Sequence, residues 1–175
     1  IVAVLVCCGP LIIKWPIKPA PFYPKNRALI FGHRGSPTCI TENTLPSFKR
    51  AIDQGVDGLE FDIRLAKDGV IMVFHDIELY RLSGETAKVS DLTSDELKKI
   101  ELYKKEGQNL EARIPTLNDL MPILHQIKVI NIEIKSEGAF DGHNIIKPLI
   151  AFLNKHQIDN KCIVSSFNPL ILLKI

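Results

Sequence analysis

Two carboxylates lie two positions apart in the segment 57–76, within a stretch where alternate residues are apolar. Glu60 and Asp62 alternate with apolar residues at positions 59, 61, 63 and 65. A strand directs successive side chains to opposite faces, so both carboxylates share one face. Neighbouring carboxylates repel each other unless a cation lies between them, and a hard divalent cation is the usual partner. The segment therefore predicts part of a metal site.

A third carboxylate follows the same pattern in the segment 129–135. Asn131, Glu133 and Lys135 alternate there with three isoleucines. Together, Glu60, Asp62 and Glu133 would provide oxygen ligands for one divalent cation, either Mg²⁺ or Ca²⁺. The alternative is the solvent-exposed polar face of an antiparallel strand. Repetition of the pattern on two strands, beside histidines at strand ends, favours the metal site.

Two histidines and two basic residues accompany these carboxylates. His33 follows an apolar segment at 28–31, and His75 follows another at 70–74. An imidazole changes charge near neutral pH, so the two histidines can serve as an acid and base pair. Arg34 and Lys135 add fixed positive charge, and a metal ion with Arg and Lys suits a phosphate group. The alternative role for these two cations is pairing with the carboxylates. The remaining histidines are predicted to be structural: His125, His143 and His156.

The elements that position these residues alternate between strands and helices. Strands are predicted at 28–31, 59–65, 70–74, 129–135 and 162–165, and helices at 45–54, 94–102, 117–125, 144–156 and from 168 onward. This order predicts a parallel sheet with helices outside it. Polar residues at several successive strand ends favour a TIM (β/α)8 barrel over an open doubly wound sheet, whose glycine-rich phosphate loop is absent from the sequence. Since a complete barrel needs about 250 residues, we expect a C-terminally truncated barrel with about five of eight strands.

The composition is that of a single globular domain. The chain has 175 residues, of which 46% are hydrophobic and 24% charged, and its net charge of +2 gives no reason to expect nucleic acid as a partner. The four cysteines have neither zinc-like spacing nor the density of a disulfide framework, so we expect free, buried thiols. Composition gives no prediction of the oligomeric state.

The N-terminal segment differs from the rest of the chain. Residues 1–15 are almost wholly apolar and residues 16–27 are rich in proline, so we predict a signal anchor or signal remnant, then a stiff linker, then one domain over 28–175. Trp15 and Lys14 resemble an interfacial anchor, which predicts membrane association through residues 1–15. The side of the membrane stays open, and a secreted, periplasmic or cytoplasmic protein is the alternative. A further alternative is that the segment packs on the domain as an apolar strand.

The ordered motifs of the domain resemble one enzyme family. These motifs are Gly32-His33-Arg34-Gly35, Glu42-Asn43-Thr44, Gly55-x-Asp57-x-x-Glu60-x-Asp62, Lys67-Asp68-Gly69, His75-Asp76, Ile114-Pro115-Thr116-Leu117, Ile132-Glu133-Ile134-Lys135 and Ser165-Ser166-Phe167. They resemble the glycerophosphodiester phosphodiesterase family from about residue 29 to the end. The departures are Thr41, where proline is common, and Ala66, where threonine is common.

The resemblance implies a TIM barrel that uses one divalent cation to hydrolyse glycerophosphodiesters to glycerol 3-phosphate and an alcohol. It implies metal binding by Glu60, Asp62 and Glu133, acid and base roles for His33 and His75, and phosphate contacts for Arg34 and Lys135. The segment 77–113 corresponds to the family's insertion, which we expect to cover the substrate. Three alternatives stay open: a lysophospholipase D-type enzyme acting on membrane lysolipids, a phosphoinositide phospholipase C barrel, and a non-catalytic, membrane-tethered binding module.

Overall fold

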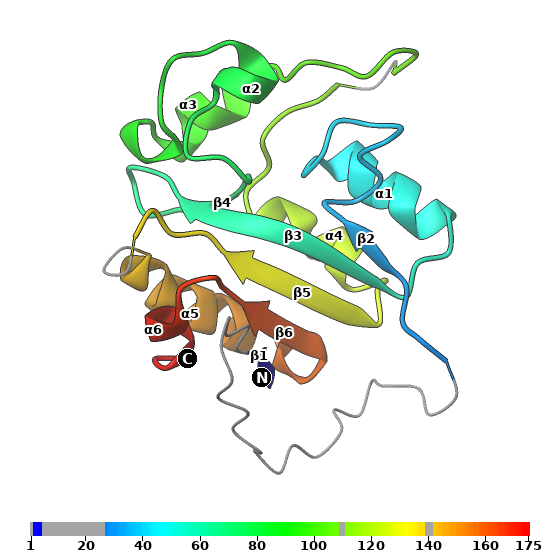
Figure 1. Cartoon of the computed structure of the whole chain (residues 1–175), viewed down its shortest axis with the longest axis vertical. Helices are drawn as coiled ribbons and strands as arrows, with labels where there is room; N and C mark the ends of the chain where they lie inside the picture. Colours follow the sequence, from blue (N-terminus) through cyan, green and yellow to red (C-terminus); the bar gives the residue numbers. More distant parts are fainter. Residues whose placement is uncertain (1, 5–26, 109–110, 139–141) are drawn as a thin grey trace, which may run out of the picture.

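The computed structural model describes residues 2–4, 27–108, 111–138 and 142–175 (Figure 1). In this part of the chain, five parallel strands form one sheet in the order β1-β6-β5-β3-β2. Their bounds are Val2–Val4 for β1, Phe31–His33 for β2, Gly58–Leu65 for β3, Val129–Ile134 for β5 and Cys162–Ser165 for β6. The parallel sheet and its alternation with helices are those of a barrel wall, as the sequence predicts.

The strand β4 (Ile71–Val73) does not belong to the parallel series. It pairs antiparallel with β3, so that Ile63 lies opposite Val73. The two strands are joined by a short turn in which Gly69 adopts a φ of +78°. A turn of this length allows only an antiparallel hairpin, because a parallel neighbour needs a crossover of a dozen or more residues. The prediction that 70–74 is one strand of the parallel sheet was therefore wrong, and β1 is the fifth parallel strand.

The first strand of the domain begins later than predicted. We expected it at 28–31, whereas β2 comprises Phe31–His33. The Ile30 amide donates to the Asp57 carboxylate at 3.0 Å, and the Ile30 side chain is exposed. Arg27 also pairs with Asp57. Arg27 and Ile30 are therefore both held by this one carboxylate.

The predicted helices are present, with shorter bounds in several cases. Their ranges are Leu45–Asp53 for α1, Ser94–Lys99 for α3, Met121–Leu124 for α4, Ile146–His156 for α5 and Pro169–Leu172 for α6. The short helix α2 (Tyr80–Ser83) was not predicted. Short 3-10 turns at Asn118–Leu120 and His143–Ile145 precede α4 and α5. The helix predicted at 94–102 ends at Lys99, because Ile100 is extended and the Leu102 amide donates instead to the Ala112 carbonyl at 2.8 Å.

Alternation along β3 separates an apolar face from a polar one. Leu59, Phe61 and Ile63 are fully buried in one core with residues of α1, α4, α5 and α6. Phe48 of α1 packs edge-on against Phe61, with ring centroids 5.8 Å apart. The side chains of Glu60 and Asp62 consequently point away from these helices.

The segment 77–113 has a core of its own rather than forming a loose loop. It contains α2, α3 and the 3-10 turn Val89–Asp91, which lie together beyond β4 (Figure 1). Leu79, Leu97 and Leu102 are buried there against Met72 and Phe74. The antiparallel hairpin therefore supplies the surface on which the segment 77–113, called the excursion below, folds.

Two expectations concern parts of the chain that the structure describes incompletely. Of the N-terminal segment 1–15, only β1 is described, and the linker 16–27 is described only at Arg27. Among the described residues, none of the helices has the length and apolar character needed to cross a bilayer. Membrane association through 1–15 stays a prediction.

The two described cysteines differ in exposure. Cys162 is buried as expected, whereas Cys39 is exposed, so for Cys39 the prediction of a buried thiol was wrong.

Candidate metal and phosphate site

The register of the parallel strands brings the predicted carboxylates together. Asp62 of β3 lies opposite Glu133 of β5, and Glu60 lies opposite His33 of β2. Side chains at neighbouring register positions of parallel strands share a face, so all three acidic groups point to the same side. Each of Glu60, Asp62 and Glu133 offers an oxygen within 4.8 Å of the others. The two separate sequence patterns thus form one acidic cluster.

The surroundings of Glu60 disfavour a negative charge on its side chain. Glu60 is only 7% exposed, and its Oε1 atom has no hydrogen-bond partner among the described residues. Burial, followed by repulsion from Asp62 and Glu133, raises the pKa of Glu60 to about 8, although a hydrogen bond from the Arg34 amide opposes the change. A divalent cation bound by carboxylate oxygens would remove this repulsion and give the buried oxygen a partner. The residues present therefore fit a hard divalent cation.

Asp62 is held from three sides. It is fully buried, and its Oδ2 atom accepts from Asn43 Nδ2 at 2.9 Å and lies 3.2 Å from Arg34 Nε. Its Oδ1 atom lies 3.0 Å from Lys135 Nζ. Arg34 and Lys135 thus pair with a carboxylate, as in the alternative role that the sequence left open. The same contacts place both cations beside the acidic cluster.

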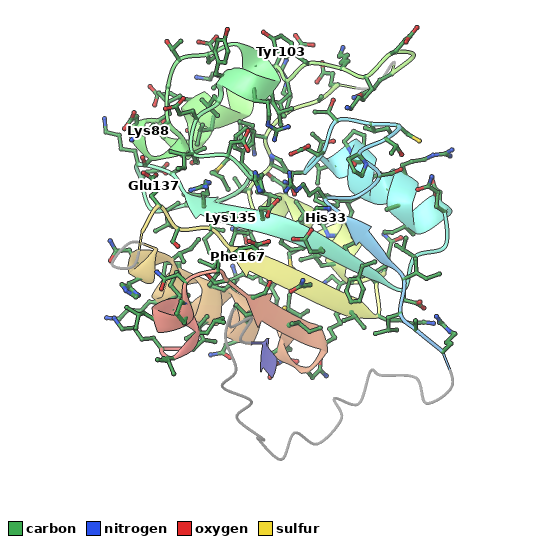
Figure 2. The ribbon with its side chains drawn as sticks, viewed as in Figure 1. His33, Lys88, Tyr103, Lys135, Glu137 and Phe167 are labelled. Carbon is green, nitrogen blue, oxygen red and sulfur yellow. The ribbon has the colours of Figure 1, made fainter. Side chains whose placement is uncertain are left out.

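Lys135 lies directly after β5 and faces the end of β6. Its Nζ donates to Glu133 Oε1 at 2.6 Å and lies 5.8 Å from the centroid of the Phe167 ring. The Phe167 side chain is 82% exposed. Figure 2 labels His33 at the end of β2, Lys135 directly after β5 and Phe167 shortly after β6. A positive charge and an aromatic face therefore border the acidic cluster.

The two histidines contact different carboxylates. His33 is largely exposed, and its Nε2 atom is 3.5 Å from Glu60 Oε2. His75 follows Phe74, whose amide donates to the Asp62 carbonyl at 3.0 Å. The ring of His75 contacts Asp76, with 2.6 Å between Nδ1 and Oδ1. This contact leaves Nε2 of His75 available to another group.

The backbone between β2 and α1 is strained where it supplies site residues. Arg34 and Asn43 adopt positive φ values of 57° and 55°, which are uncommon for residues with side chains. The Arg34 amide donates to the Glu60 carbonyl at 2.8 Å, and the Asn43 amide donates to the Arg34 carbonyl at 3.0 Å. This closed loop directs both side chains at Asp62.

Four residues of the site received no role from the sequence. Asn43 contacts Asp62, Asp76 contacts His75, and Glu42 and Arg81 connect these groups. Glu42, Asn43 and Asp76 belong to the motifs quoted above, and that position was the available signal. Arg81 had no such signal, since it lies in the excursion.

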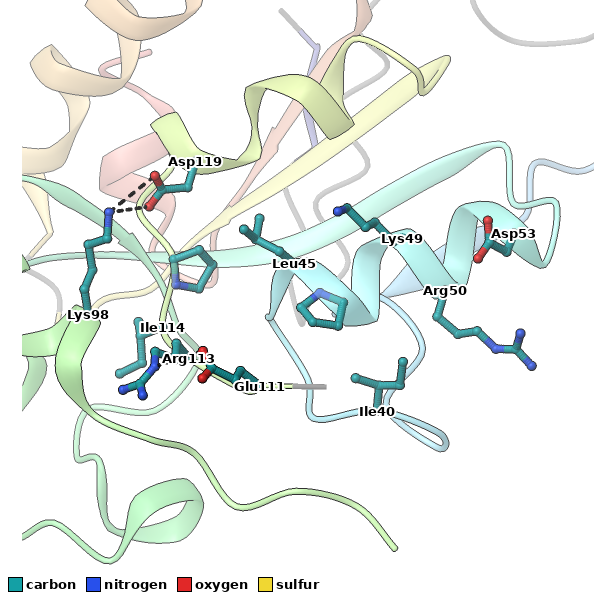
Figure 3. A pocket seen from close by; sticks show the side chains of 12 residues that line it. Ile40, Leu45, Lys49, Arg50, Asp53, Lys98, Glu111, Arg113, Ile114 and Asp119 are labelled. Atoms are coloured by element: carbon teal, nitrogen blue, oxygen red, sulfur yellow. Dashed lines mark hydrogen bonds and ion pairs between the residues drawn. The ribbon is translucent and has the colours of Figure 1, made fainter. Parts of the chain in front are cut away.

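A separate hollow lies away from this cluster. It has a volume of about 710 Å³ and lies between α1 and the segment 111–119 (Figure 3). Leu45, Lys49 and Ile114 are among its lining residues, as is Lys98, which pairs with Asp119. None of the carboxylates or histidines of the candidate site lines it.

Fold and site together define a class of protein, namely (β/α)8 barrels with an acidic cluster at the carboxyl ends of their strands. Residues 33–175 match the Glycerophosphoryl diester phosphodiesterase family, and the chain belongs to this family. Both the predicted resemblance and the TIM-barrel fold class are confirmed.

Individual relatives agree with this assignment. A glycerophosphodiester phosphodiesterase of Caldanaerobacter subterraneus subsp. tengcongensis is 36% identical over 144 residues, which cover 81% of this chain and 59% of the relative. A crystal structure of a glycerophosphodiester phosphodiesterase from Thermotoga maritima has a TM-score of 0.67 and 35% identity, covering 83% of this chain and 57% of that one. An Oleispira antarctica phosphodiesterase in complex with the product sn-glycerol-3-phosphate has a TM-score of 0.73 and 30% identity, covering 83% and 60%. The chain therefore spans less than two thirds of the length of these relatives.

Proposed function

We propose that the complete protein hydrolyses glycerophosphodiesters to glycerol 3-phosphate and an alcohol. The observation that carries this proposal is the acidic cluster of Glu60, Asp62 and Glu133 with Arg34 and Lys135 beside it. This combination suits a phosphodiester, which carries a negative charge and develops more during cleavage. The relative from Oleispira antarctica, which holds sn-glycerol-3-phosphate as product, supports the choice of substrate.

One divalent cation, Mg²⁺ or Ca²⁺, would be held by Glu60, Asp62 and Glu133. When bound, such an ion supplies positive charge that polarises the phosphoryl oxygens. The three carboxylates contribute by holding oxygens within 4.8 Å of one another, with Glu60 and Asp62 buried. The high pKa of Glu60 means that ion binding must displace a proton near neutral pH.

Arg34 and Lys135 would bind the phosphate. Both contact Asp62, at 3.2 and 3.0 Å, so each lies at the edge of the cluster. An anionic phosphate adjacent to Asp62 would attract the same two cations. Arg34 can then offer two parallel N–H groups, whereas Lys135 offers a point charge.

His33 and His75 would move the protons. One histidine takes a proton from the nucleophile, which is either water or the glycerol hydroxyl of the substrate, and the other protonates the leaving alkoxide. The contact between His75 Nδ1 and Asp76 orients this ring, and Nε2 is then the reacting atom. Attack by the glycerol hydroxyl would form a cyclic phosphate, which phosphorus NMR distinguishes from glycerol 3-phosphate.

The direct test is product analysis with the complete protein. Glycerophosphocholine and lysophosphatidylcholine are offered separately with Mg²⁺ or Ca²⁺, and products are followed by phosphorus NMR. We expect glycerol 3-phosphate and choline from the first substrate, with little turnover of the second. Preference for lysophosphatidylcholine would indicate a lysophospholipase D-type enzyme, and turnover of neither would indicate a binding module. Either result would refute the proposal.

A further inference from the structure

Arg81 reaches from the excursion back to the candidate site. It lies in α2, a four-residue helix with no buried residue, and its own side chain is 47% exposed. Leu79, directly before α2, is fully buried and anchors this part of the excursion. The position of Arg81 is therefore set by the excursion's core, whereas its guanidinium contacts residues outside that core.

The guanidinium of Arg81 contacts two carboxylates at once. Its Nε donates to Asp76 Oδ2. Its two terminal nitrogens donate to Glu42, at 2.7 Å to Oε1 and 3.3 Å to Oε2. These hydrogen bonds, first with Glu42 and then with Asp76, raise the pKa of Arg81 further above its ordinary value. Arg81 is thus a fixed cation held between two anions.

Each of these carboxylates also contacts a residue of the proposed machinery. Asp76 Oδ1 is 2.6 Å from His75 Nδ1, and Glu42 Oε1 accepts from the Arg34 guanidinium at 2.9 Å. Burial raises the pKa of both carboxyl groups, but the hydrogen bonds from their basic partners outweigh it and hold each pKa below its ordinary value. Both carboxylates are therefore charged at neutral pH, and the contacts form one continuous network from His75 to Arg34.

We propose that Arg81 is a positioning residue that orients His75 through Asp76 and Arg34 through Glu42. The inference rests on the proposed function for the roles of His75 and Arg34. With Oδ2 of Asp76 held by Arg81, Oδ1 faces the imidazole and keeps its proton on Nδ1. With Oε1 of Glu42 shared, the Arg34 guanidinium is directed toward Asp62. Lysine cannot replace Arg81, because a single ammonium lacks the fork that serves both carboxylates.

The kinetic test uses Arg81→Ala and Arg81→Lys in the complete protein. We expect kcat to fall about 10- to 100-fold in both variants, as for other residues that orient a reacting group. The matched control is Arg113→Ala, since Arg113 belongs to the same excursion, is 40% exposed and pairs with Glu111 instead. We expect this control to stay within twofold of the wild type. If kcat of Arg81→Ala stays within twofold of the wild-type kcat, the inference is overturned.

Double variants separate the two arms of the network. Asp76→Asn should lower mainly kcat, whereas Glu42→Gln should raise mainly KM. Adding Arg81→Ala to either variant should then lower kcat/KM by a smaller factor than it does in the wild type, because one arm of the network is already lost. If Arg81→Ala lowers kcat/KM by the same factor in the wild type, in Asp76→Asn and in Glu42→Gln, Arg81 acts elsewhere and the inference is overturned.

A spectroscopic readout is independent of turnover and of metal. Long-range ¹H–¹⁵N spectra of the metal-free protein report which nitrogen of the His75 ring carries the proton. We expect the Nδ1–H form in the wild type and in Arg113→Ala, and a mixture with the Nε2–H form in Arg81→Ala. An unchanged His75 spectrum in Arg81→Ala would refute the inference even in an active enzyme. If the wild type hydrolyses no glycerophosphodiester, the proposed function fails while this spectrum still decides the role of Arg81.

Discussion

Replacing Glu60 with glutamine tests the electrostatics of the acidic cluster. Burial and the neighbouring carboxylates raise the pKa of Glu60 from 4.5 to about 8 in the metal-free fold. Between these two values the folded protein keeps a proton that the unfolded chain has lost. Stability of the wild type must therefore fall as pH rises from about 4.5 to about 8. Glutamine carries no charge to bury, so Glu60→Gln should not show this loss.

The pKa difference gives the size of the effect. At about 1.4 kcal/mol per pH unit, the raised pKa costs the metal-free wild type up to about 5 kcal/mol above pH 8. In EDTA, the free energy of unfolding of Glu60→Gln relative to that of the wild type should consequently rise by a few kcal/mol between pH 5 and pH 9. Urea denaturation followed by circular dichroism measures both free energies of unfolding.

Added metal should narrow this difference. A ligand at about 100 times its Kd stabilises a folded protein by about 2.7 kcal/mol, and Glu60→Gln should lack most of this gain. If the difference between the two free energies of unfolding stays constant from pH 5 to pH 9 in EDTA, the reasoning is refuted. That result would mean that Glu60 carries no unfavourable buried charge.

Three further substitutions test the loop, the core and the proton transfer. Gly35→Ala should lower the free energy of unfolding by about 2–4 kcal/mol in urea titrations, because its Cβ would lie 2.4 Å from Ser47 Oγ at a φ of +88°; a loss below about 0.5 kcal/mol would contradict this packing. Phe48→Ala should lower the free energy of unfolding by about 3–5 kcal/mol in the same assay, because the ring is fully buried. A free energy of unfolding close to that of the wild type would place Phe48 outside the core. His75→Ala should abolish turnover while calorimetry still detects metal binding, with the exposed His125→Ala as control; near-normal turnover would remove His75 from the mechanism.

The sequence predicted the strands best where the two faces differ in burial. In β3 and β5, apolar residues alternate with Glu60, Asp62 and Glu133, so the pattern shows both the strand and the face. Alternation alone did not give the direction of β4, whereas the short gap between the strands predicted at 59–65 and 70–74 permits only an antiparallel pair. Nor did it locate the start of β2, which depends on a side-chain contact with Asp57 across 27 positions.

The candidate site was predictable as far as its residues lie on strands or in motifs. Parallel register then brings Asp62 opposite Glu133, as the alternation implied. Arg81 could not be predicted, because its contact with Glu42 joins residues 39 positions apart through a helix of the excursion. Such contacts depend on how the excursion packs, which no local pattern encodes.

The most direct test of the central claim is the metal dependence of glycerophosphocholine hydrolysis. Rates are measured for the complete protein in EDTA and after Mg²⁺ or Ca²⁺ is restored, with Glu133→Gln as the test variant. Glu137→Gln is the matched control, since Glu137 is exposed and pairs with Lys88 outside the cluster. We predict that EDTA abolishes hydrolysis, that a divalent cation restores it in the wild type and the control, and that Glu133→Gln stays inactive. Undiminished hydrolysis in EDTA would contradict the assignment of Glu60, Asp62 and Glu133 as metal ligands.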